Sequence, residues 1–412
     1  MNLEAGSFPI LGVLSGLRRR LSRAKAAFLI GGAVVGLVLG SVSCRGEKTY
    51  SVEIRDGIRC VHNIKSASEK PAVSLSFVRK IGELEAKDSN LLFLQPVSVA
   101  EDRPGNIYIL DRKDYCVKKF GADRKFILRF GRKGQGPGEF RQSSFYRYFD
   151  QEGHLFVYDG SPRTIIEFDG NGRYVRSYPH HFIFKAFGIL ANRDFLVGSM
   201  TGNYSEKMTQ RVAVSSPDGE IVRVLSVYPD YRLPQVKGYI FGESDLPQLC
   251  LYVSSDGSAV FGNSADYRLY LTNTLGEIVL CIEKDDPPQP FTKADKEERI
   301  NRILERQKKI KWPPPLTRGE VRSIFNALPK YKPYFVRLIM DDHKNIYVHR
   351  FYESTFDVFD RSGRYLYRMK TPFWFDAIKD GFTYRSLRVS DSGYIRIQRF
   401  KIKNWDDLIH PH

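Results

Sequence analysis

The sequence lacks the linear motifs that usually mark an enzyme or a metal centre. Its 412 residues include five cysteines and eight histidines, but no Cys-x-x-Cys pair and no histidine spacing typical of a zinc protease. There is also no Gly-x-Ser-x-Gly nucleophile elbow. We therefore predict no catalytic residue, no metal ligand and no cofactor.

A long block of basic residues is also missing, although the chain is strongly basic. Its 64 Lys and Arg residues exceed its 47 Asp and Glu residues and give a formal net charge of +17. Scattered charge of this kind is typical of a solvated basic surface. The alternative is an acidic partner, such as an anionic glycan, a lipid head group or nucleic acid.

Long apolar runs are absent, with one exception near the start. Residues 26–43 carry no charge and follow several arginines, which is typical of an export signal, although such a run could also span a bilayer as an anchor. Small residues then precede Cys44 and resemble the lipobox of bacterial lipoproteins, whose cysteine is acylated; Ser41 stands where a strong lipobox has Leu. We expect residues 1–44 to be a signal peptide ending at a lipidated Cys44, or an N-terminal membrane anchor. Both place the folded part in the cell envelope, facing the periplasm or the cell exterior. Ordinary secretion is the remaining alternative, and it also places the folded part outside the cytoplasm.

The sequence is rich in one repeat. Asp102-x-x-Gly105, followed by the alternating residues 106–111, returns as Asp150-x-x-Gly153 followed by residues 154–159. Each copy predicts a turn and a strand, and a second hairpin follows both, so the unit has four strands and roughly 40–50 residues. This period indicates an all-β fold, a β-propeller.

We expect six blades within residues 71–412, after a polar tether at residues 45–70; five or seven blades are the alternatives. The first strands are expected near residues 96, 144, 186, 249, 334 and 387. The sixth blade is one strand short, and an alternating strand near residues 73–78 would complete it and close the ring.

A helical insertion is expected between blades four and five, at residues 284–332. Thr292-x-x-Asp295 and Thr317-x-x-Glu320 are capping boxes that predict two helices. The insertion is either a lid over one face of the propeller or packed against its outside.

Two patterns that suggest ligands have simpler interpretations. Aspartates that recur at fixed places in the repeats are interpreted as turn residues and not as metal ligands. The glycines of residues 131–138 are interpreted as a loop between blades and not as a phosphate cradle, because no helix follows them. The aspartates are Asp102, Asp111, Asp150, Asp159, Asp342, Asp360 and Asp391.

Pro96-x-x-Val99, residues 105–111 and the glycine-rich residues 130–140 resemble an NHL-type repeat. With the lipoprotein-like start and the helical insertion, the chain resembles the six-bladed β-propeller lipoproteins with NHL-like repeats of bacterial cell envelopes. The resemblance implies a binding or scaffolding role and names no ligand. Other six-bladed propellers imply two alternatives: a metal-dependent hydrolase, lactonase or lyase with ligands at the central axis, and a nucleic-acid-binding propeller.

A propeller usually binds its ligand at the axial mouth, which is formed by the loops that lead into the first strand of each blade. The residues before those strands mix aromatic and cationic side chains. We therefore predict a membrane-tethered, monomeric propeller that binds an envelope protein, peptide or anionic glycan without catalysis. The candidate residues are Gln95, Arg141, Gln142, Phe184, Lys185, Gln248, Tyr334, Tyr384 and Arg385.

Apart from Cys44, the chain has four cysteines. They permit up to two disulfides in an oxidising compartment, or they are small residues buried in strands. The sequence alone does not pair them. They are Cys60, Cys116, Cys250 and Cys281.

Overall fold

The computed structural model describes residues 48–65, 73–82, 88–102, 104–123, 125–141, 143–161, 163–202, 208–231, 246–308, 314–351, 353–375, 377–389 and 394–409. All of these belong to one unit, residues 43–412. The predicted signal segment and Cys44 lie outside the described residues. Within them, no helix is both long enough and apolar enough to cross a membrane.

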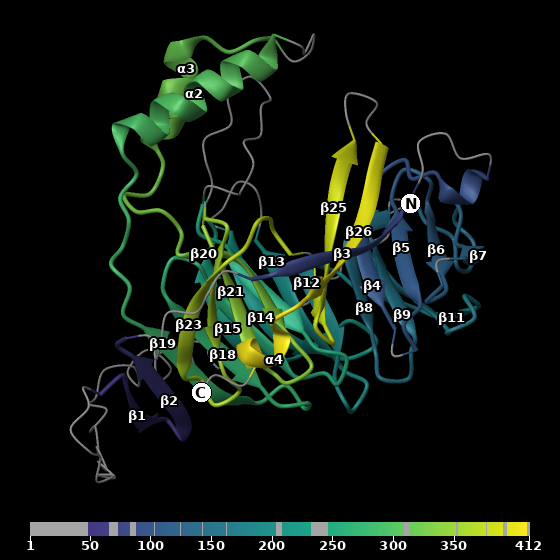
Figure 1. Cartoon of the computed structure of the whole chain (residues 1–412), viewed down its shortest axis with the longest axis horizontal. Helices are drawn as coiled ribbons and strands as arrows, with labels where there is room; N and C mark the ends of the chain where they lie inside the picture. Colours follow the sequence, from purple (N-terminus) through teal and green to yellow (C-terminus); the bar gives the residue numbers. More distant parts are fainter. Residues whose placement is uncertain are drawn as a thin grey trace, which may run out of the picture. The chain divides into compact units, whose positions relative to one another are not determined.

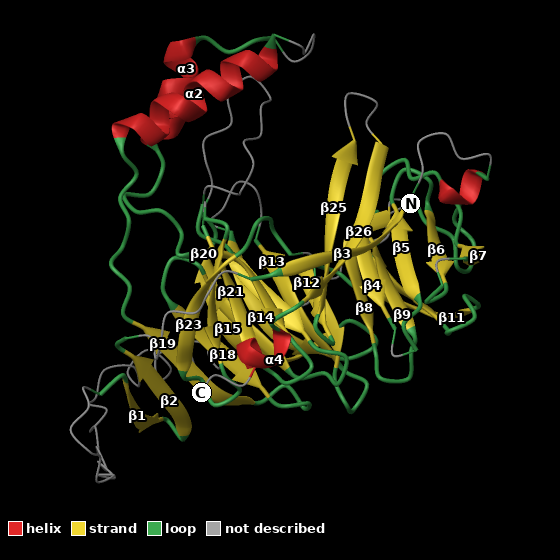
Figure 2. Ribbon diagram, viewed as in Figure 1, coloured by secondary structure: helices red, strands yellow, loops and turns green. Residues whose placement is uncertain are grey.

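The strands form six sheets, which are the six blades of a β-propeller (Figures 1 and 2). Blade one contains β4 Pro96–Glu101, β5 Ile107–Asp111, β6 Cys116–Phe120 and β7 Phe126–Phe130. Blade two contains β8 Ser143–Phe149, β9 Leu155–Asp159, β10 Thr164–Phe168 and β11 Tyr174–Pro179. Blade three contains β12 Ile183–Ile189, β13 Phe195–Thr201, β14 Thr209–Ser215 and β15 Ile221–Pro229.

The remaining blades follow the same order, in which the first strand of each blade pairs with the second and the fourth strand ends the sheet. Blade four contains β16 Leu249–Val253, β17 Ala259–Asn263, β18 Arg268–Thr272 and β19 Ile278–Lys284. Blade five contains β20 Phe335–Met340, β21 Ile346–Arg350, β22 Thr355–Phe359 and β23 Tyr365–Lys370. Blade six contains β24 Ile378–Lys379, β25 Phe382–Val389, β26 Tyr394–Ile402 and β3 Leu75–Ile81.

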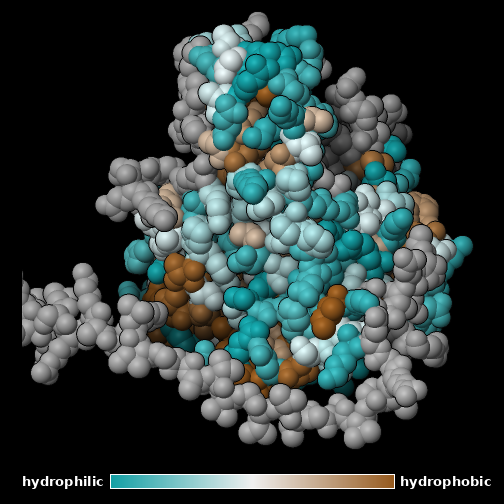
Figure 3. Space-filling model, turned by 90° about the vertical axis from the view of Figure 1, so that its left-hand side faces the viewer, coloured by the Kyte–Doolittle hydropathy of each residue, from teal (hydrophilic) through white to brown (hydrophobic). Residues whose placement is uncertain are grey.

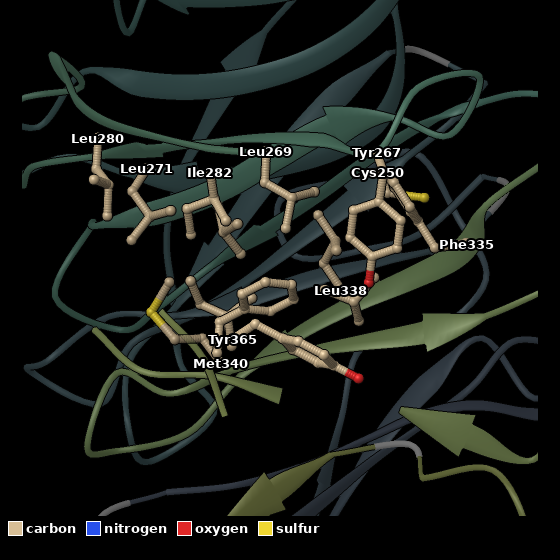
Figure 4. Close-up of a cluster of buried hydrophobic side chains, with 14 of the residues drawn as sticks. Cys250, Tyr267, Leu269, Leu271, Leu280, Ile282, Phe335, Leu338, Met340 and Tyr365 are labelled. Carbon is tan, nitrogen blue, oxygen red and sulfur yellow. The ribbon is translucent and has the colours of Figure 1, made fainter. Parts of the chain in front are cut away.

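The blades are held together by apolar clusters that lie between neighbours. In the cluster between blades four and five, Leu269 and Ile282 point toward Leu338 and Met340 (Figure 4). A corresponding cluster joins blade six to blade one and contains Ile81. Each blade buries both of its faces in this way, so that the ring is closed.

The strand β3 completes blade six, as the sequence predicts. It pairs antiparallel with β26, and Ile81 lies opposite Ile397. The first strand of this blade differs from the prediction, because it is the short β24 and not the strand near residue 387. β25 is therefore the second strand of blade six and β26 the third.

A hairpin replaces most of the predicted tether. Residues 50–63 form β1 Tyr50–Arg55 and β2 Ile58–Asn63, which pair antiparallel. β2 then pairs in parallel with β19, so that blade four has six strands. Residues 50–63 of the predicted polar tether at residues 45–70 thus belong to the folded domain. The buried Val61 of this hairpin joins the cluster between blades four and five.

The insertion forms α2 Lys293–Gln307 and α3 Arg318–Asn326, and both predicted capping boxes are present. The two helices share an apolar cluster with Leu246, which precedes β16. At the base of the insertion, Phe291 contacts Phe351 of blade five, with ring centroids 6.4 Å apart. The insertion thus packs on loops near the first strands of blades four and five. The described residues also contain two short helices, the 3-10 helix η1 Ser89–Leu91 and α4 Trp405–Ile409.

Candidate functional site

We call the loops that lead into the first strands the leading loops, and in blades one and two they are fixed by carboxylates at the ends of the second strands. Buried Asp111 accepts the backbone N–H of Gln95 at 2.8 Å. In blade two, buried Asp159 accepts the N–H of Arg141 at 2.6 Å. A carboxylate that accepts backbone donors satisfies polar groups that would otherwise be buried without partners. These repeated aspartates therefore hold the loops in place.

The other repeated aspartates stabilise the turns between first and second strands, or between third and fourth strands. Each accepts the N–H of the residue four positions later, at 2.7 to 3.0 Å: Asp102, Asp150, Asp341 and Asp360. The turn interpretation is confirmed for three of the predicted residues. In blade five the residue is Asp341 and not Asp342, whose carboxylate accepts the N–H of Asp380 at 2.9 Å. Asp391 lies outside the described residues.

Four of the predicted ligand residues lie in leading loops, as expected. Gln95 and Arg141 are exposed, whereas Gln248 and Tyr334 are half-buried. The ring of Tyr334 packs 5.7 Å from that of Tyr267. Gln142 lies outside the described residues.

Two predicted ligand residues are buried inside the ring. Phe184 belongs to the cluster between blades two and three, and Tyr384 to the cluster between blades six and one. Tyr384 lies within the second strand of its blade, because β24 is the first. Neither side chain is accessible to a ligand, and both expectations are therefore corrected.

Two cationic residues approach the same thiol from different blades. Lys185 lies at a β-bulge in the first strand of blade three, and Arg337 lies in the first strand of blade five. Cys250 lies on β16, the first strand of blade four. Burial raises the pKa of Cys250 to about 12, while the positive charges of Arg337 and Lys185 lower it. Cationic residues on the first strands of blades three and five thus act on a buried thiol of blade four.

The leading loop of blade six presents an aromatic surface that the sequence analysis did not single out. Trp374 is 60% exposed and packs edge-on against His349, with ring planes inclined by 68° and ring centroids 5.1 Å apart. Arg385 places its guanidinium 4.7 Å from the centroid of the Phe373 ring. Arg337 donates a hydrogen bond to the carbonyl of Phe375 at 3.1 Å. Two arginines therefore flank a loop of three consecutive aromatic residues.

Further rings extend this surface along blade six. Phe373 lies 4.8 Å from Phe400, which lies 5.8 Å from Phe77 on β3. Phe77 is 56% exposed, which is unusual for a large apolar side chain. We name this group the aromatic surface; it consists of Phe77, Phe373, Trp374, Phe400 and Arg385.

His349 packs against Trp374 of the aromatic surface, and its ring is uncharged. Its side chain stacks on Phe356 at 4.7 Å, and its Nε2 lies 3.1 Å from the carbonyl of Glu353. Burial lowers the pKa of His349 to about 4, so the ring is uncharged at neutral pH. It therefore acts as a packing partner of Trp374.

One grouping of metal-ligating side chains occurs among the described residues, Asp150, Glu152 and His154 in a single turn of blade two. Arg193 already forms ion pairs with Asp150 at 3.3 Å and Glu152 at 3.8 Å. His154 contacts the buried Glu167 at 2.6 Å. This grouping is not the axial set from several blades that the hydrolase hypothesis requires, and its charge is partly neutralised.

The glycine-rich stretch forms a loop between blades one and two. The carboxylate of Glu139 accepts the N–H of Gly136 at 2.9 Å and an N–H of Arg132 at 2.6 Å. A carboxylate therefore occupies the backbone donor that a phosphate would need. The loop interpretation agrees with the structure.

Comparisons with known proteins agree on the fold. Residues 56–230 match the profile of a family described as a 6-bladed beta-propeller. A solved structure of a candidate exported protein from Bacteroides fragilis is 14% identical, with coverage of 84% of this chain and 99% of that one and a TM-score of 0.50. A DUF4221 family member from Bacteroides vulgatus is 13% identical, with coverage of 81% and 99% and a TM-score of 0.45.

A virginiamycin B lyase from Staphylococcus aureus is also similar, at 10% identity, with coverage of 80% of this chain and 99% of that one and a TM-score of 0.41. No curated protein sequence matches the chain. The chain is a six-bladed β-propeller, as its sequence predicts, and likeness at this level of identity shows the fold alone.

Proposed function

We propose that this protein is an exported, membrane-tethered binding module of the cell envelope that holds an anionic peptide or glycan at the aromatic surface without catalysing a reaction. The observation that carries the proposal is the exposed Trp374, which lies beside a phenylalanine covered by Arg385. The predicted export signal and Cys44 support the tethered location.

The chemistry of the aromatic surface suits binding. Trp and Arg are the residues that most often dominate binding energy, because a large flat ring loses much contact with water and a guanidinium forms paired hydrogen bonds. Stacking of Arg385 on Phe373 restrains the guanidinium before a ligand arrives. A carboxylate or sulfate could then accept both of its parallel N–H donors.

The charge of the whole chain favours the same class of partner. The formal net charge is +17, of which residues 1–43 contribute +4 through five basic residues and one acidic residue, so the part from Cys44 onward is also strongly basic. Such a charge attracts anions over distances beyond direct contact, and salt screens this attraction. Binding is therefore expected to weaken as ionic strength rises. The affinity of a neutral glycan should gain little from this electrostatic attraction.

Calorimetric titration of the full chain tests the proposal, with poly-glutamate and polygalacturonate as anionic probes and a neutral glucan as the comparison. Trp374→Ala should weaken binding of the anionic probe by roughly 30-fold or more, equivalent to about 2 kcal/mol. Arg385→Gln should weaken it less and reduce its salt dependence.

Arg176→Gln is a matched control, because Arg176 also stacks on an aromatic ring, Tyr178, at 4.5 Å, but on blade two. It should bind the probe like the unmodified protein. Equal losses in Arg176→Gln and Trp374→Ala, or equal affinity for the neutral glucan, would contradict the proposal.

A further inference from the structure

Two of the described cysteines are neighbours at the junction between the N-terminal hairpin and blade four. β2 pairs in parallel with β19, and Cys60 is the register partner of Cys281. Both side chains are buried, and their thiols are close enough to form a hydrogen bond. The two residues are brought together by tertiary structure alone, since they lie far apart in the sequence.

The pairing geometry suits a covalent bond. Register partners on adjacent strands project their side chains to the same side of the sheet. Adjacent strands lie about 4.8 Å apart, within the range of roughly 4.4–6.8 Å that separates the Cα atoms of disulfide-linked cysteines. A disulfide at this position therefore needs little movement of the backbone.

We propose that Cys60 and Cys281 form a disulfide when the protein folds in an oxidising compartment, and that this bond fastens the N-terminal hairpin to blade four. The other two described cysteines face different partners. In the strand register Cys116 pairs with Asp111, and Cys250 pairs with Gly262. They are expected to remain thiols.

The bond forms by exchange with a low-molecular-weight disulfide such as oxidised glutathione. One protein thiolate attacks the oxidant and releases one glutathione thiol; the second attacks the mixed disulfide and releases the other, so two protein thiols become one disulfide and the oxidant becomes two thiols. Burial raises the pKa of Cys281 to about 12, which leaves little thiolate in the folded protein. The exchange therefore occurs while the hairpin docks.

A metal site explains the same cysteines less well. Glu283 is the register partner of His62, so both lie on the same side of the sheet as the two thiols. Arg55 binds both carboxylate oxygens of Glu283, at 2.7 and 2.9 Å, and Arg268 binds one of them at 2.8 Å. These four side chains are not among the groupings of the described residues that could hold a metal. A cation would have to displace two guanidinium groups.

The disulfide would secure a weakly covered element. β1 is the outer strand of its sheet, and its Ile54 is 65% exposed. Figure 3 shows apolar areas on the side of the molecule that carries the hairpin. The free edge of an outer strand can pair with other chains. The cross-link keeps the hairpin on blade four.

Mass spectrometry of the refolded full chain tests the inference. The protein is unfolded with urea and reductant, refolded in a glutathione redox buffer, and its free thiols are blocked with N-ethylmaleimide under denaturing conditions. Trypsin then releases residues 60–65, which contain Cys60, and residues 269–284, which contain Cys281. These two peptides should appear joined, two hydrogens lighter than their sum, and separate on reduction.

Two variants provide controls. Cys116→Ser should leave the joined peptides unchanged, whereas Cys281→Ser should yield Cys60 fully blocked by N-ethylmaleimide. Recovery of both Cys60 and Cys281 as blocked thiols, from protein that still melts cooperatively, would overturn the inference. Joining of Cys60 to Cys116 or Cys250 would overturn it as well.

Discussion

At the scale of single residues, Glu283 connects three strands of the extended blade four. Its carboxylate accepts hydrogen bonds from Arg55 on β1 and from Arg268 on β18, while its own backbone belongs to β19. The hydrogen bonds from Arg55, with the positive charge of Arg268, lower the pKa of Glu283 to about 2. The ionised form is therefore stabilised by folding.

This shift predicts a dependence of stability on pH. A folded pKa below the unfolded value means that the contribution of Glu283 is complete above about pH 4.5 and is lost as the pH falls toward 2. The urea midpoint of the unmodified protein should therefore fall more steeply from pH 5 to pH 2 than that of Glu283→Gln. The two midpoints should differ most at neutral pH.

Tryptophan fluorescence during urea unfolding measures both midpoints. Glu53→Gln is the control, because Glu53 lies on β1 and also contacts Arg55 but is largely exposed. Its pH profile should follow that of the unmodified protein, since exposed ion pairs contribute little. Parallel pH profiles for Glu283→Gln and the unmodified protein would show that the carboxylate has no such role.

At the scale of elements, a glycine in the outer hairpin allows adjacent blades to pack. Gly172, between β10 and β11, has a φ of +74°, a conformation that L side chains rarely adopt. A Cβ atom there would lie 2.6 Å from Cδ1 of Phe130 in blade one. Gly363 repeats the arrangement in blade five, where a Cβ would lie 3.0 Å from Ile282 of blade four. The glycine in the turn between the third and fourth strands thus allows both the positive φ of the turn and close packing against the neighbouring blade.

Substitutions of Gly172 and Gly153 separate the cost of backbone strain from the cost of overpacking at the interface between blades. Gly172→Ala should lower the free energy of unfolding by about 2–5 kcal/mol, because backbone strain adds to overpacking against Phe130. Gly153→Ala should cost only about 1–2 kcal/mol, because Gly153 has a similar φ of +84° but open space around it. Denaturant titration measures both values, and equal losses would mean that the interface tolerates the methyl group.

At the scale of the whole molecule, closure depends on one strand from the beginning of the chain. β3 pairs with β26 and brings Ile81 into the cluster between blades six and one. Without it, β26 would become an unpaired outer strand beside an incomplete cluster. The hairpin of residues 50–63 is different, because it adds to a blade that already has four strands.

Truncation distinguishes these two roles. A chain that begins at residue 73 keeps β3 and should remain monomeric, with a single cooperative thermal transition. A chain that begins at residue 83 lacks β3 and should aggregate or lose cooperativity, because an open ring exposes apolar surface and a strand edge. Size-exclusion chromatography and thermal unfolding compare the two, and identical behaviour would show that β3 is dispensable for closure.

The sequence predicts the positions of the candidate residues only in part. Arg385 was expected near a leading loop and does contribute to the aromatic surface. The sequence does not indicate Trp374, because the two-residue strand β24 gives no periodic signal and the alternating residues near 387 predict a later first strand for blade six. The same misassignment placed Tyr384 at the mouth, although it is buried. The sequence signal that could indicate the aromatic surface is the run of three aromatic residues, 373–375, that follows blade five.

By itself, the sequence determined the repeated turns and the two capping boxes, because these depend on residues within about four positions of one another, and its repeats favoured six blades. The tertiary structure decided which segments that are distant in the sequence pair with one another. The hairpin joins blade four through residues such as Asn63, which bonds to the carbonyl of Glu283 220 positions away. Such register is set by packing and by backbone pairing, which leave no local pattern. For the same reason only the folded chain brings Cys60 beside Cys281.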